Sequence, residues 1–313
     1  MADQFKGKDI IVTGGTGSIG SEIVRQLLET GAAKIRIYSR DEHKQHELRQ
    51  ELGADPRLAF LGGDVRDKDR LDFAFQGVDI CFHAAALKHV PFCEYNPFEA
   101  LKTNAIGTQN VIEVAIRNNL EKVVAVSTDK AVSPESVLGA SKLMMERLIA
   151  AANLTAGRNR TRFACVRFGN VIASRGSVVH LWRKQIEEGG PVTVTHKRVS
   201  RFFMEIPEAV GLIFSATELM RGGEIFVLKM KKHLIYDYAQ ELIKKFGNGA
   251  KIAIKVIGLR PGEKLDEELF TKEERSHMLE TKTMYIITPQ QLVPDYTYAP
   301  SSYPGSRKAI IRR

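Results

Sequence analysis

The chain has 313 residues, 43% of them hydrophobic, so it is long enough to bury a large core in one α/β domain or in a large and a small one. Its formal net charge of +9 is scattered among acidic residues without a basic stripe, which favours an anionic small substrate over nucleic acid. No apolar run approaches the ~18 residues of a membrane span, and we expect no signal peptide at the start of the sequence.

Three cysteines, Cys81, Cys93 and Cys165, have no metal-ligand spacing and cannot all pair with one another. A reduced compartment is the simplest interpretation of this pattern. We therefore expect a cytoplasmic protein with no metal site and no membrane contact.

A glycine-rich turn near the start predicts a dinucleotide site. Residues 9–13 (DIIVT) form a predicted buried strand, and an amphipathic helix follows the turn as far as about Glu29. Glycines in this context permit a tight turn and close approach to a pyrophosphate that the helix N-terminus faces. The expected cofactor contacts in the turn are Gly14, Thr16, Gly17, Ser18, Ile19 and Gly20.

The end of the second predicted strand, residues 34–38, indicates which cofactor is used. An acidic residue normally follows this strand when the cofactor carries a free ribose 2′-hydroxyl. Here Ser39, Arg40 and Lys44 offer a hydroxyl and two cations to a 2′-phosphate, so we predict NADP rather than NAD. The alternative is that Arg40 is a surface residue beside an NAD-binding Asp41.

Two further predicted strands, residues 58–61 and 79–83, also end in candidate cofactor contacts. The first would flank the adenine, and the second leads into small side chains against which the cofactor could lie. The expected contacts are Asp64 and Val65 after the first strand and Ala84, Ala85 and Ala86 after the second.

Lys88 comes next, and it either pairs with a phosphate or the substrate or is simply solvated. A long helix predicted over residues 97–118 carries Asn104, whose amide would brace the centre of the fold beside the cofactor.

The fifth predicted strand, residues 123–126, ends in a cluster of chemically active side chains, Ser127, Thr128, Asp129 and Lys130. In open parallel sheets, ligands bind outside the carboxyl ends of the strands, so these residues are placed to touch a reacting molecule. In isolation, Asp129 would more commonly cap a helix and Lys130 would be solvated. The rest of the chain favours the catalytic interpretation.

After a sixth predicted strand, residues 162–168, the alternation of strands and helices becomes less regular. Phe168 and Asn170 would still reach the cofactor, and the polar, glycine-punctuated loop of residues 169–178 suits ligand binding. The expected substrate contacts are Lys88, Asn170, Ser177, Val178, Arg201, Arg260 and Glu263.

The alternation of strands and helices predicts a Rossmann-type doubly wound parallel sheet. We expect residues 1–170 to form an NADP-binding domain, its sheet completed by later segments, and residues 171–288 to form a smaller substrate-binding lobe. Residues 289–313, rich in Pro, Ser and Tyr, predict a surface wrap or a disordered tail. The elements expected in the lobe are helices near residues 179–188 and 206–219, strands near 223–228 and 252–256, and a helix after Gly262.

Seven motifs spread along the chain together indicate a protein family: TGGTGSIG (13–20), YSRDEHK (38–44), HAAALKHVP (83–91), STDKAV (127–132), VRFGNVIASRGSV (166–178), SRFFMEIPEAV (200–210) and GLRPGEKLDEEL (258–269). Together they resemble the extended short-chain dehydrogenase/reductase superfamily and, within it, the UDP-N-acetylglucosamine 4,6-dehydratases of polysaccharide biosynthesis. The resemblance implies an NADP-dependent enzyme acting on UDP-N-acetylglucosamine, and a homo-oligomer.

Two branches of that family are mixed in the sequence. YSRDEHK is similar to the soluble inverting enzymes, whereas GGPVTVTH and FFMEIPEAV are similar to the membrane-anchored retaining ones, whose N-terminal membrane region we do not expect here. The C5 configuration of the product therefore stays open.

One position departs from the superfamily pattern, whose proton-transfer signature is Tyr-x-x-x-Lys with the lysine holding the nicotinamide ribose. The corresponding segment here carries Lys142 but has Leu138 in place of the tyrosine. An epimerase or reductase of this type needs the tyrosine phenol, so Leu138 disfavours both of these activities. Some 4,6-dehydratases carry methionine at this position, so Leu138 does not exclude a dehydratase. A non-catalytic NADP-binding regulator is the remaining alternative.

The resemblance therefore moves the proton chemistry onto Thr128, Asp129 and Lys130. C4 of the sugar is oxidised, water is lost across C5 and C6, and hydride returns to C6. For this, Lys130 must begin neutral, with a lowered pKa, and Asp129 must hold a proton. If both are charged and paired, they are a structural ion pair with no acid-base role.

Overall fold

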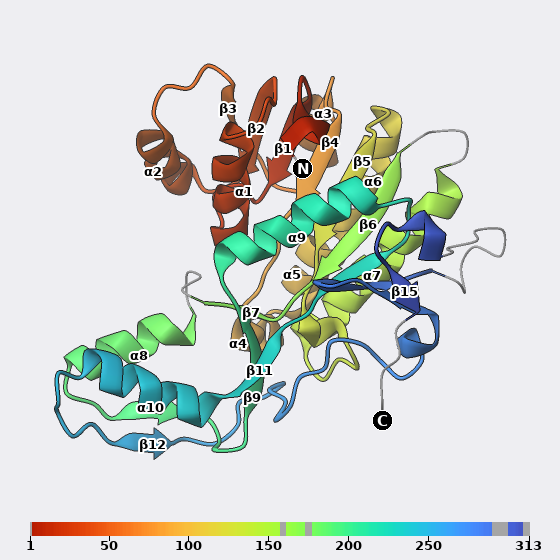
Figure 1. Ribbon diagram of the computed structural model, residues 1–313. Helices are drawn as coiled ribbons and strands as arrows, with labels where there is room; N and C mark the ends of the chain where they lie inside the picture. The colour runs from red at the N-terminus through yellow and green to blue at the C-terminus, as the bar shows by residue number, and fades with distance from the viewer. Residues whose placement is uncertain (1, 157–160, 173–176, 290–299, 309–313) are drawn as a thin grey trace.

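The computed structural model describes residues 2–156, 161–172, 177–289 and 300–308. Within these residues, one large sheet runs through the molecule (Figure 1). Its strands are β1 (Asp9–Thr13), β2 (Lys34–Ser39), β3 (Leu58–Gly62), β4 (Ile80–His83), β5 (Lys122–Val126), β6 (Arg162–Arg167), β10 (Ile225–Leu228), β13 (Met278–Glu280), β14 (Met284–Ile287) and β15 (Arg307–Lys308).

The strand order is β15-β13-β14-β10-β6-β5-β4-β1-β2-β3. From β3 to β10 neighbouring strands are parallel, and β14, β13 and β15 then add an antiparallel edge. The predicted Rossmann-type doubly wound sheet is therefore confirmed.

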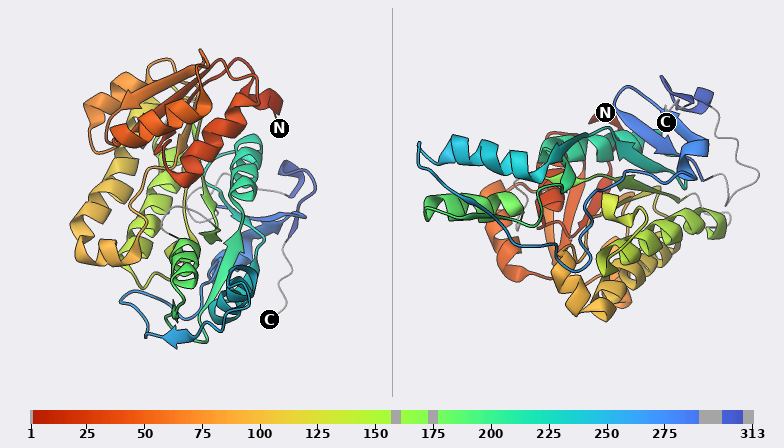
Figure 2. Two further views of the ribbon diagram at one scale, coloured as in Figure 1. Left: turned by 90° about the vertical axis from the view of Figure 1, so that its left-hand side faces the viewer. Right: turned by 90° about the horizontal axis from the view of Figure 1, so that it is seen from below.

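Helices cover both faces of this sheet. They are α1 (Ser18–Leu28), α2 (Glu42–Leu52), α3 (Lys68–Phe75), α4 (Val90–Tyr95), α5 (Pro97–Ala100), the π-helical segment η2 (Leu101–Ile106), α6 (Gly107–Arg117), α7 (Val137–Thr155) and α9 (Ile206–Leu219). α1 and α9 pack together on one face, while α3, α6 and α7 lie on the other (Figures 1 and 2). Residues predicted as one long helix from 97 to 118 thus form a helical run with a π-helical segment in its middle.

Alternating side chains explain the two-sided core. Ile10 and Val12 of β1 pack into the cluster under α1 and α9, and Ile11 packs into the cluster under α3, α6 and α7. Successive side chains of a strand point to opposite faces, so an all-apolar strand such as β1 must be covered on both sides.

The smaller lobe contains two small sheets and two helices. Its helices α8 (Val178–Glu187) and α10 (Ile235–Phe246) pack around the fully buried Trp182. Figure 2 shows this lobe projecting beyond the large sheet. Its strands are β7 (Asn170–Val171), β9 (Ser200–Met204) and β11 (Lys231–Leu234) in one sheet, and β8 (Val192–Val194) and β12 (Ile254–Val256) in the other.

Three elements that we predicted for the lobe are placed differently. α9 and β10 belong to the large sheet layer, because the apolar face of α9 packs against α1 and the side chains of Phe226 and Val227 in β10 are buried on opposite faces. Among the described residues after Gly262 there is no α-helix, only the short 3-10 turns η4 (Glu274–His277) and η5 (Pro300–Ser302).

Part of the predicted tail is built into the core. The 3-10 turn η5 (Pro300–Ser302) leads to Tyr303, which is fully buried and whose hydroxyl donates to Glu224 Oε1 at 2.7 Å. β15 then pairs with β13 at the sheet edge, so residues 300–308 are not a disordered tail but a mostly exposed segment that Tyr303 anchors in the core. Residues 290–299 and 309–313 lie outside the described residues.

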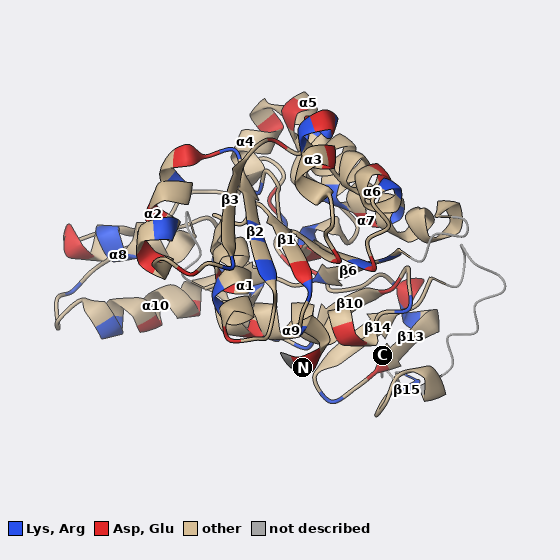
Figure 3. Ribbon diagram, turned by 90° about the horizontal axis from the view of Figure 1, so that it is seen from above, with Lys and Arg blue, Asp and Glu red and all other residues tan. Residues whose placement is uncertain are grey.

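The surface carries no helix suited to a membrane: within the described ranges, none is both long and apolar enough to span one. Acidic and basic residues are interspersed over the outer helices rather than sorted by sign (Figure 3).

A buried ion network joins the end of β6 to the rest of the fold. Arg167 is fully buried, and its guanidinium donates to Glu146 of α7 at 3.0 and 2.6 Å and to Glu274 of η4 at 3.0 and 2.9 Å. Burial favours the neutral form of Glu274, but hydrogen bonds and charge from Arg167 outweigh it and lower its pKa. This network fixes the strand end that leads into Phe168 and Asn170.

We expect Arg167→Met to lower the free energy of unfolding by about 3–5 kcal/mol, because it leaves the buried Glu146 and the half-buried Glu274 without their cation. Urea unfolding monitored by circular dichroism measures the loss. Arg25→Met is the matched control: Arg25 pairs with Glu22 and Glu51 at the surface, where such pairs contribute about 1 kcal/mol or less. Equal stability of the two variants would contradict the buried network's role.

Candidate active site

A cavity of about 840 Å³ lies where the parallel strands end and the smaller lobe begins. Residues after β1, β2, β3, β4, β5 and β6 line one side, and lobe residues such as Trp182, Phe203 and Ile235 line the other. The carboxyl ends of parallel strands are where ligands bind in such folds, so the topology itself builds this site.

The glycine-rich turn forms the floor of the cavity after β1. Gly14 has φ +67°, and a Cβ there would lie 2.7 Å from the backbone of Ala85; a Cβ at Gly20 would lie 2.3 Å from Gly14 O. Both positions therefore require glycine. α1 starts at Ser18 without a side-chain cap, which leaves its N-terminus as an anion site of the kind that holds pyrophosphates.

The residues predicted to bind the ribose 2′-phosphate of NADP lie together after β2, and each already has a hydrogen-bond or ion-pair partner within the protein. Ser39 Oγ is 2.7 Å from Thr16 Oγ1, and Arg40 forms an ion pair of 3.5 Å with Asp64. Lys44 pairs with Asp41, whose carboxylate caps α2. Both cations stay at the cavity rim, so this arrangement accommodates either nicotinamide cofactor.

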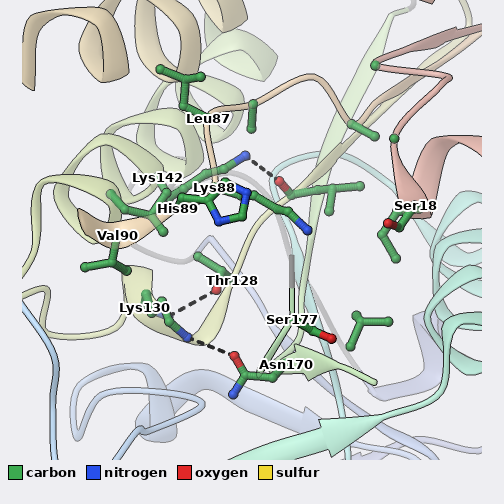
Figure 4. A pocket seen from close by; sticks show the side chains of 18 of the residues that line it. Ser18, Leu87, Lys88, His89, Val90, Thr128, Lys130, Lys142, Asn170 and Ser177 are labelled. Atoms are coloured by element: carbon green, nitrogen blue, oxygen red, sulfur yellow. Dashed lines mark hydrogen bonds between the residues drawn. The ribbon is translucent and has the colours of Figure 1, made fainter. Parts of the chain in front are cut away.

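The cluster predicted after β5 is assembled around one ammonium group. Lys130 Nζ lies 3.0 Å from Asp129 Oδ1, 3.4 Å from Asn170 Oδ1 and 3.6 Å from Glu267 Oε1. Thr128 Oγ1 donates to the same Asp129 oxygen at 2.9 Å. Figure 4 shows Thr128, Lys130 and Asn170 converging on the cavity.

The expectation that Lys130 has a lowered pKa is wrong. Burial favours the neutral amine, but the charges of Asp129 and Glu267 and the hydrogen bond to Asp129 outweigh it, so the pKa of Lys130 is raised. In the protein without substrate, Lys130 is an ammonium held between carboxylates. Asp129 is adjacent to Lys130 in the sequence, but the second carboxylate, Glu267, is 137 positions away, so the local sequence shows only part of this opposition to burial.

Two predicted residues do not line the cavity. Asp129 is fully buried behind Lys130. Asn104 is also fully buried; its Oδ1 accepts from Leu87 N, and its Nδ2 donates to Leu87 O and Ser141 Oγ. Asn104 therefore braces the loop after β4 against α7 instead of contacting a ligand in the cavity.

Lys142 and Leu138 stand one turn apart on α7. Lys142 lines the cavity, and its Nζ donates to Val126 O at 2.8 Å. Burial lowers the pKa of Lys142 to about 8. Leu138 lines the same wall and packs with Cys93 and Ala100.

On the lobe side, Arg201 is buried and donates to Glu263 Oε1 at 3.1 Å, while Thr195 Oγ1 donates to the same oxygen at 2.9 Å. Arg260 is exposed at the cavity rim. These residues place two guanidinium groups, a carboxylate and a hydroxyl on the lobe side of the cavity.

The remaining predicted site residues are brought together in this one cavity. They are Val65, Ala84, Ala86, Lys88, Ser127, Phe168, Ser177 and Val178, beside those already described. The prediction missed the apolar lobe residues, His89 and Glu267. Only Glu267 carried a signal, as the second acidic residue of LDEEL in the GLRPGEKLDEEL motif.

Several buried polar atoms of the lining residues have no hydrogen-bond partner within the described part of the chain. They are Thr103 Oγ1, Ser127 Oγ, Ser177 Oγ and Glu267 Oε2. Buried polar atoms are rarely left unsatisfied, so their presence here is typical of a site completed by a ligand.

Comparison with known proteins identifies relatives over most of the chain. A family model described as "Polysaccharide biosynthesis protein" matches residues 10–289. An uncharacterized membrane protein of Methanocaldococcus jannaschii is 53% identical, over 92% of this chain and 88% of that protein. A UDP-N-acetylglucosamine 4,6-dehydratase (inverting) of Campylobacter jejuni is 44% identical (91% and 84%), and a UDP-glucose 4-epimerase of Rickettsia canadensis is 41% identical (98% and 90%).

Among solved structures, the X-ray structure of Pen from Bacillus thuringiensis is 43% identical with a TM-score of 0.89, covering 92% of this chain and 90% of that one. The fold, the cavity and these likenesses define an enzyme of the extended short-chain dehydrogenase/reductase type, in its group of dehydratases and epimerases. Within that class, the chain belongs to the polysaccharide biosynthesis protein family.

The buried amine of Lys142 makes stability depend on pH. Its pKa is about 8 in the fold and about 10.4 in an unfolded chain, so the unfolded chain binds more protons between these values and stability rises with pH there. Lys142→Met removes this contribution. We expect the stability of the variant relative to the native chain to fall by about 2–3 kcal/mol between pH 7 and pH 10.

Urea unfolding at both pH values measures this difference, with Lys251→Met, which changes an exposed lysine, as the baseline. A difference between Lys142→Met and the native chain that stays constant with pH would contradict the burial of a titrating amine.

Proposed function

We propose that this protein is an NADP-dependent UDP-N-acetylglucosamine 4,6-dehydratase. The observation that carries the proposal is Lys130, held between carboxylates on the wall of a cavity that also contains a dinucleotide-type glycine turn. The 44% identity to a Campylobacter jejuni enzyme of this name supports the choice of reaction.

The cofactor fits the residues on the β1 side of the cavity. The Gly14–Gly20 turn would hold the pyrophosphate, and Val65 and Ala85 would lie along the adenosine half. Ser127 Oγ, buried without a partner in the described residues, and Lys142 would hold the nicotinamide half. When bound, the cofactor would take hydride from C4 of the sugar and return it to C6.

The chain's own contribution is proton transfer at C5 and C6. A C4 ketone acidifies the C5 proton, and we assign its removal to Lys130, which lines the cavity and must first give up its own ammonium proton to a neighbouring base. Asp129 lies behind Lys130 and accepts hydrogen bonds from Thr128 and Lys130, so we propose that it positions Lys130 rather than touching the sugar. Arg201, Arg260 and Glu263 would bind the UDP portion.

A 4-epimerase is the second candidate, because a relative of that name is 41% identical over 98% of this chain. Leu138 weighs against it. An epimerase of this superfamily uses the tyrosine phenol at that position, and an alkyl side chain cannot transfer a proton. Product mass separates the two reactions, since an epimer keeps the mass of the substrate.

We expect incubation with UDP-N-acetylglucosamine in deuterated water to release a product lighter by one water and carrying deuterium at C5. Mass spectrometry and NMR of the product measure both, and the C5 signal gives its configuration. Lys130→Ala should lose at least ~10²-fold in turnover, the typical contribution of a proton-transfer group, while retaining cofactor affinity. Unchanged product mass, or near-normal turnover in Lys130→Ala, would contradict the proposal.

The choice of NADP rests on Arg40. Arg40→Ala should weaken NADP⁺ binding by about 10-fold or more, the contribution of one hydrogen bond to a charged group, and leave NAD⁺ binding nearly unchanged. Calorimetric titration with both cofactors measures this. Arg66→Ala is the matched control, because Arg66 pairs with the same Asp64 but does not line the cavity. Equal losses for both cofactors in Arg40→Ala would remove the 2′-phosphate role.

A homo-oligomer and a cytoplasmic location stay predictions. Exposed apolar side chains on the helices after β4 and β5 support pairing with a second copy of the chain, because association would remove them from water. They are Phe92, Tyr95, Phe98, Leu101 and Met144.

A further inference from the structure

Glu267 is a buried carboxylate on the cavity wall that the mechanism above does not use. Its segment is anchored on both sides: Ser200 N donates to Leu265 O at 2.9 Å, and Arg167 Nη1 donates to Leu269 O at 2.9 Å. Between these anchors Glu267 is only 2% exposed, yet it lines the cavity. The backbone therefore fixes this carboxylate in one place beside Lys130.

One ammonium is shared by two carboxylates at this point. Glu267 Oε1 lies 3.6 Å from Lys130 Nζ, and Asp129 Oδ1 lies 3.0 Å from it. Glu267 Oε2 is buried and has no hydrogen-bond partner among the described residues. Burial raises the pKa of Glu267, Asp129 adds to the rise, and the cations Lys130, Arg201 and Lys264 only partly oppose it. Glu267 therefore binds a proton more readily than an ordinary glutamate side chain does.

We propose that Glu267 is the proton partner of Lys130: it takes the ammonium proton when substrate fills the cavity and delivers it to the departing C6 oxygen. This inference rests on the dehydratase reaction proposed above. In the first step an N–H bond of Lys130 breaks and an O–H bond forms on Glu267, so an ammonium and a carboxylate become an amine and a carboxylic acid.

The elimination then restores the charged pair. Lys130 takes the C5 proton, the C5–H electrons form the C5–C6 double bond, and the C6–O bond breaks as its oxygen receives the proton of Glu267 and leaves as water. After hydride reaches C6, the Lys130 ammonium reprotonates C5. The proton released when the C4 hydroxyl becomes a ketone passes to solvent. After C5 is reprotonated, Lys130 takes one proton back from solvent, which replaces the proton that left with the water.

Solvation sets the direction of the first transfer. Without substrate, the Lys130 side chain keeps 18% of its surface exposed, and water there stabilises its charge. A bound sugar displaces that water, and a desolvated ion pair loses stability relative to a neutral amine and acid. Both carboxylates keep one buried oxygen without a partner among the described residues, Asp129 Oδ2 and Glu267 Oε2, but only Glu267 lines the cavity and can pass a proton to a bound sugar.

Three variants test the proposal. Glu267→Gln keeps the size of the side chain but cannot accept a proton, whereas Glu267→Asp keeps the acid and changes the reach. We expect kcat to fall by about 100-fold in Glu267→Gln with KM for UDP-N-acetylglucosamine little changed, and Glu267→Asp to retain more activity. Glu268→Gln, at the exposed neighbouring position, should match the native chain. A Gln variant as active as the Asp variant would overturn the proton role.

A second measurement needs no turnover. Competitive acetylation followed by mass spectrometry reports the pH at which Lys130 becomes an uncharged amine. Asp129 and Glu267 raise the Lys130 pKa against burial and Arg201, so Glu267→Gln should shift acetylation of Lys130 to lower pH, and Glu268→Gln should not. An unshifted profile in Glu267→Gln would overturn the coupling. The predicted shift in a protein that releases no dehydrated product would instead overturn the proposed function.

Discussion

A single ammonium held between two buried carboxylates is the interaction on which the active site depends. Lys130 draws together Asp129 from its own turn and Glu267 from a segment far along the chain. Removing charged groups from water costs several kcal/mol each, so such a cluster persists only when its members compensate one another. The fold meets this requirement by anchoring both carboxylates: Asp129 through Thr128, and Glu267 through the backbone contacts of Leu265 and Leu269.

Parallel topology explains why these groups meet a cofactor site at all. The strands from β3 to β6 end at one edge, which brings Gly14, Ser39 and Ala85 to the same cavity as Lys130. The lobe then covers this edge, and Arg201 of β9 reaches it because β9 pairs with β7 directly after β6. The residues proposed to bind the UDP portion and those proposed to transfer protons therefore line the same cavity.

Local signals in the sequence were sufficient for the parts of the site that are local in structure. The glycine turn and the polar residues after each strand could be predicted because their roles follow from the element that precedes them. Long-range pairings could not: α9 and β10 were assigned to the lobe, although they complete the large sheet, and Tyr303 was placed in a tail, although it is buried in the core. Nothing in their immediate neighbours distinguishes these packings.

The charge state of Lys130 is the most instructive error, and it bears on Leu138. From sequence alone, burial is the visible influence on a lysine at a strand end, and burial lowers its pKa. The adjacent Asp129 opposes this influence, and so does Glu267, which only the folded chain brings within 3.6 Å. Leu138, meanwhile, packs with Cys93 and Ala100 and offers no proton. Because position 138 has no phenol, we expect the protons of the reaction to pass through other cavity groups that can change charge. A lysine that starts as an ammonium needs a neighbouring base before it can act as a base itself. Glu267 lines the cavity and lies beside Lys130, so it can serve as that base. In the proposed mechanism, the buried glutamate is thus needed because the tyrosine is missing.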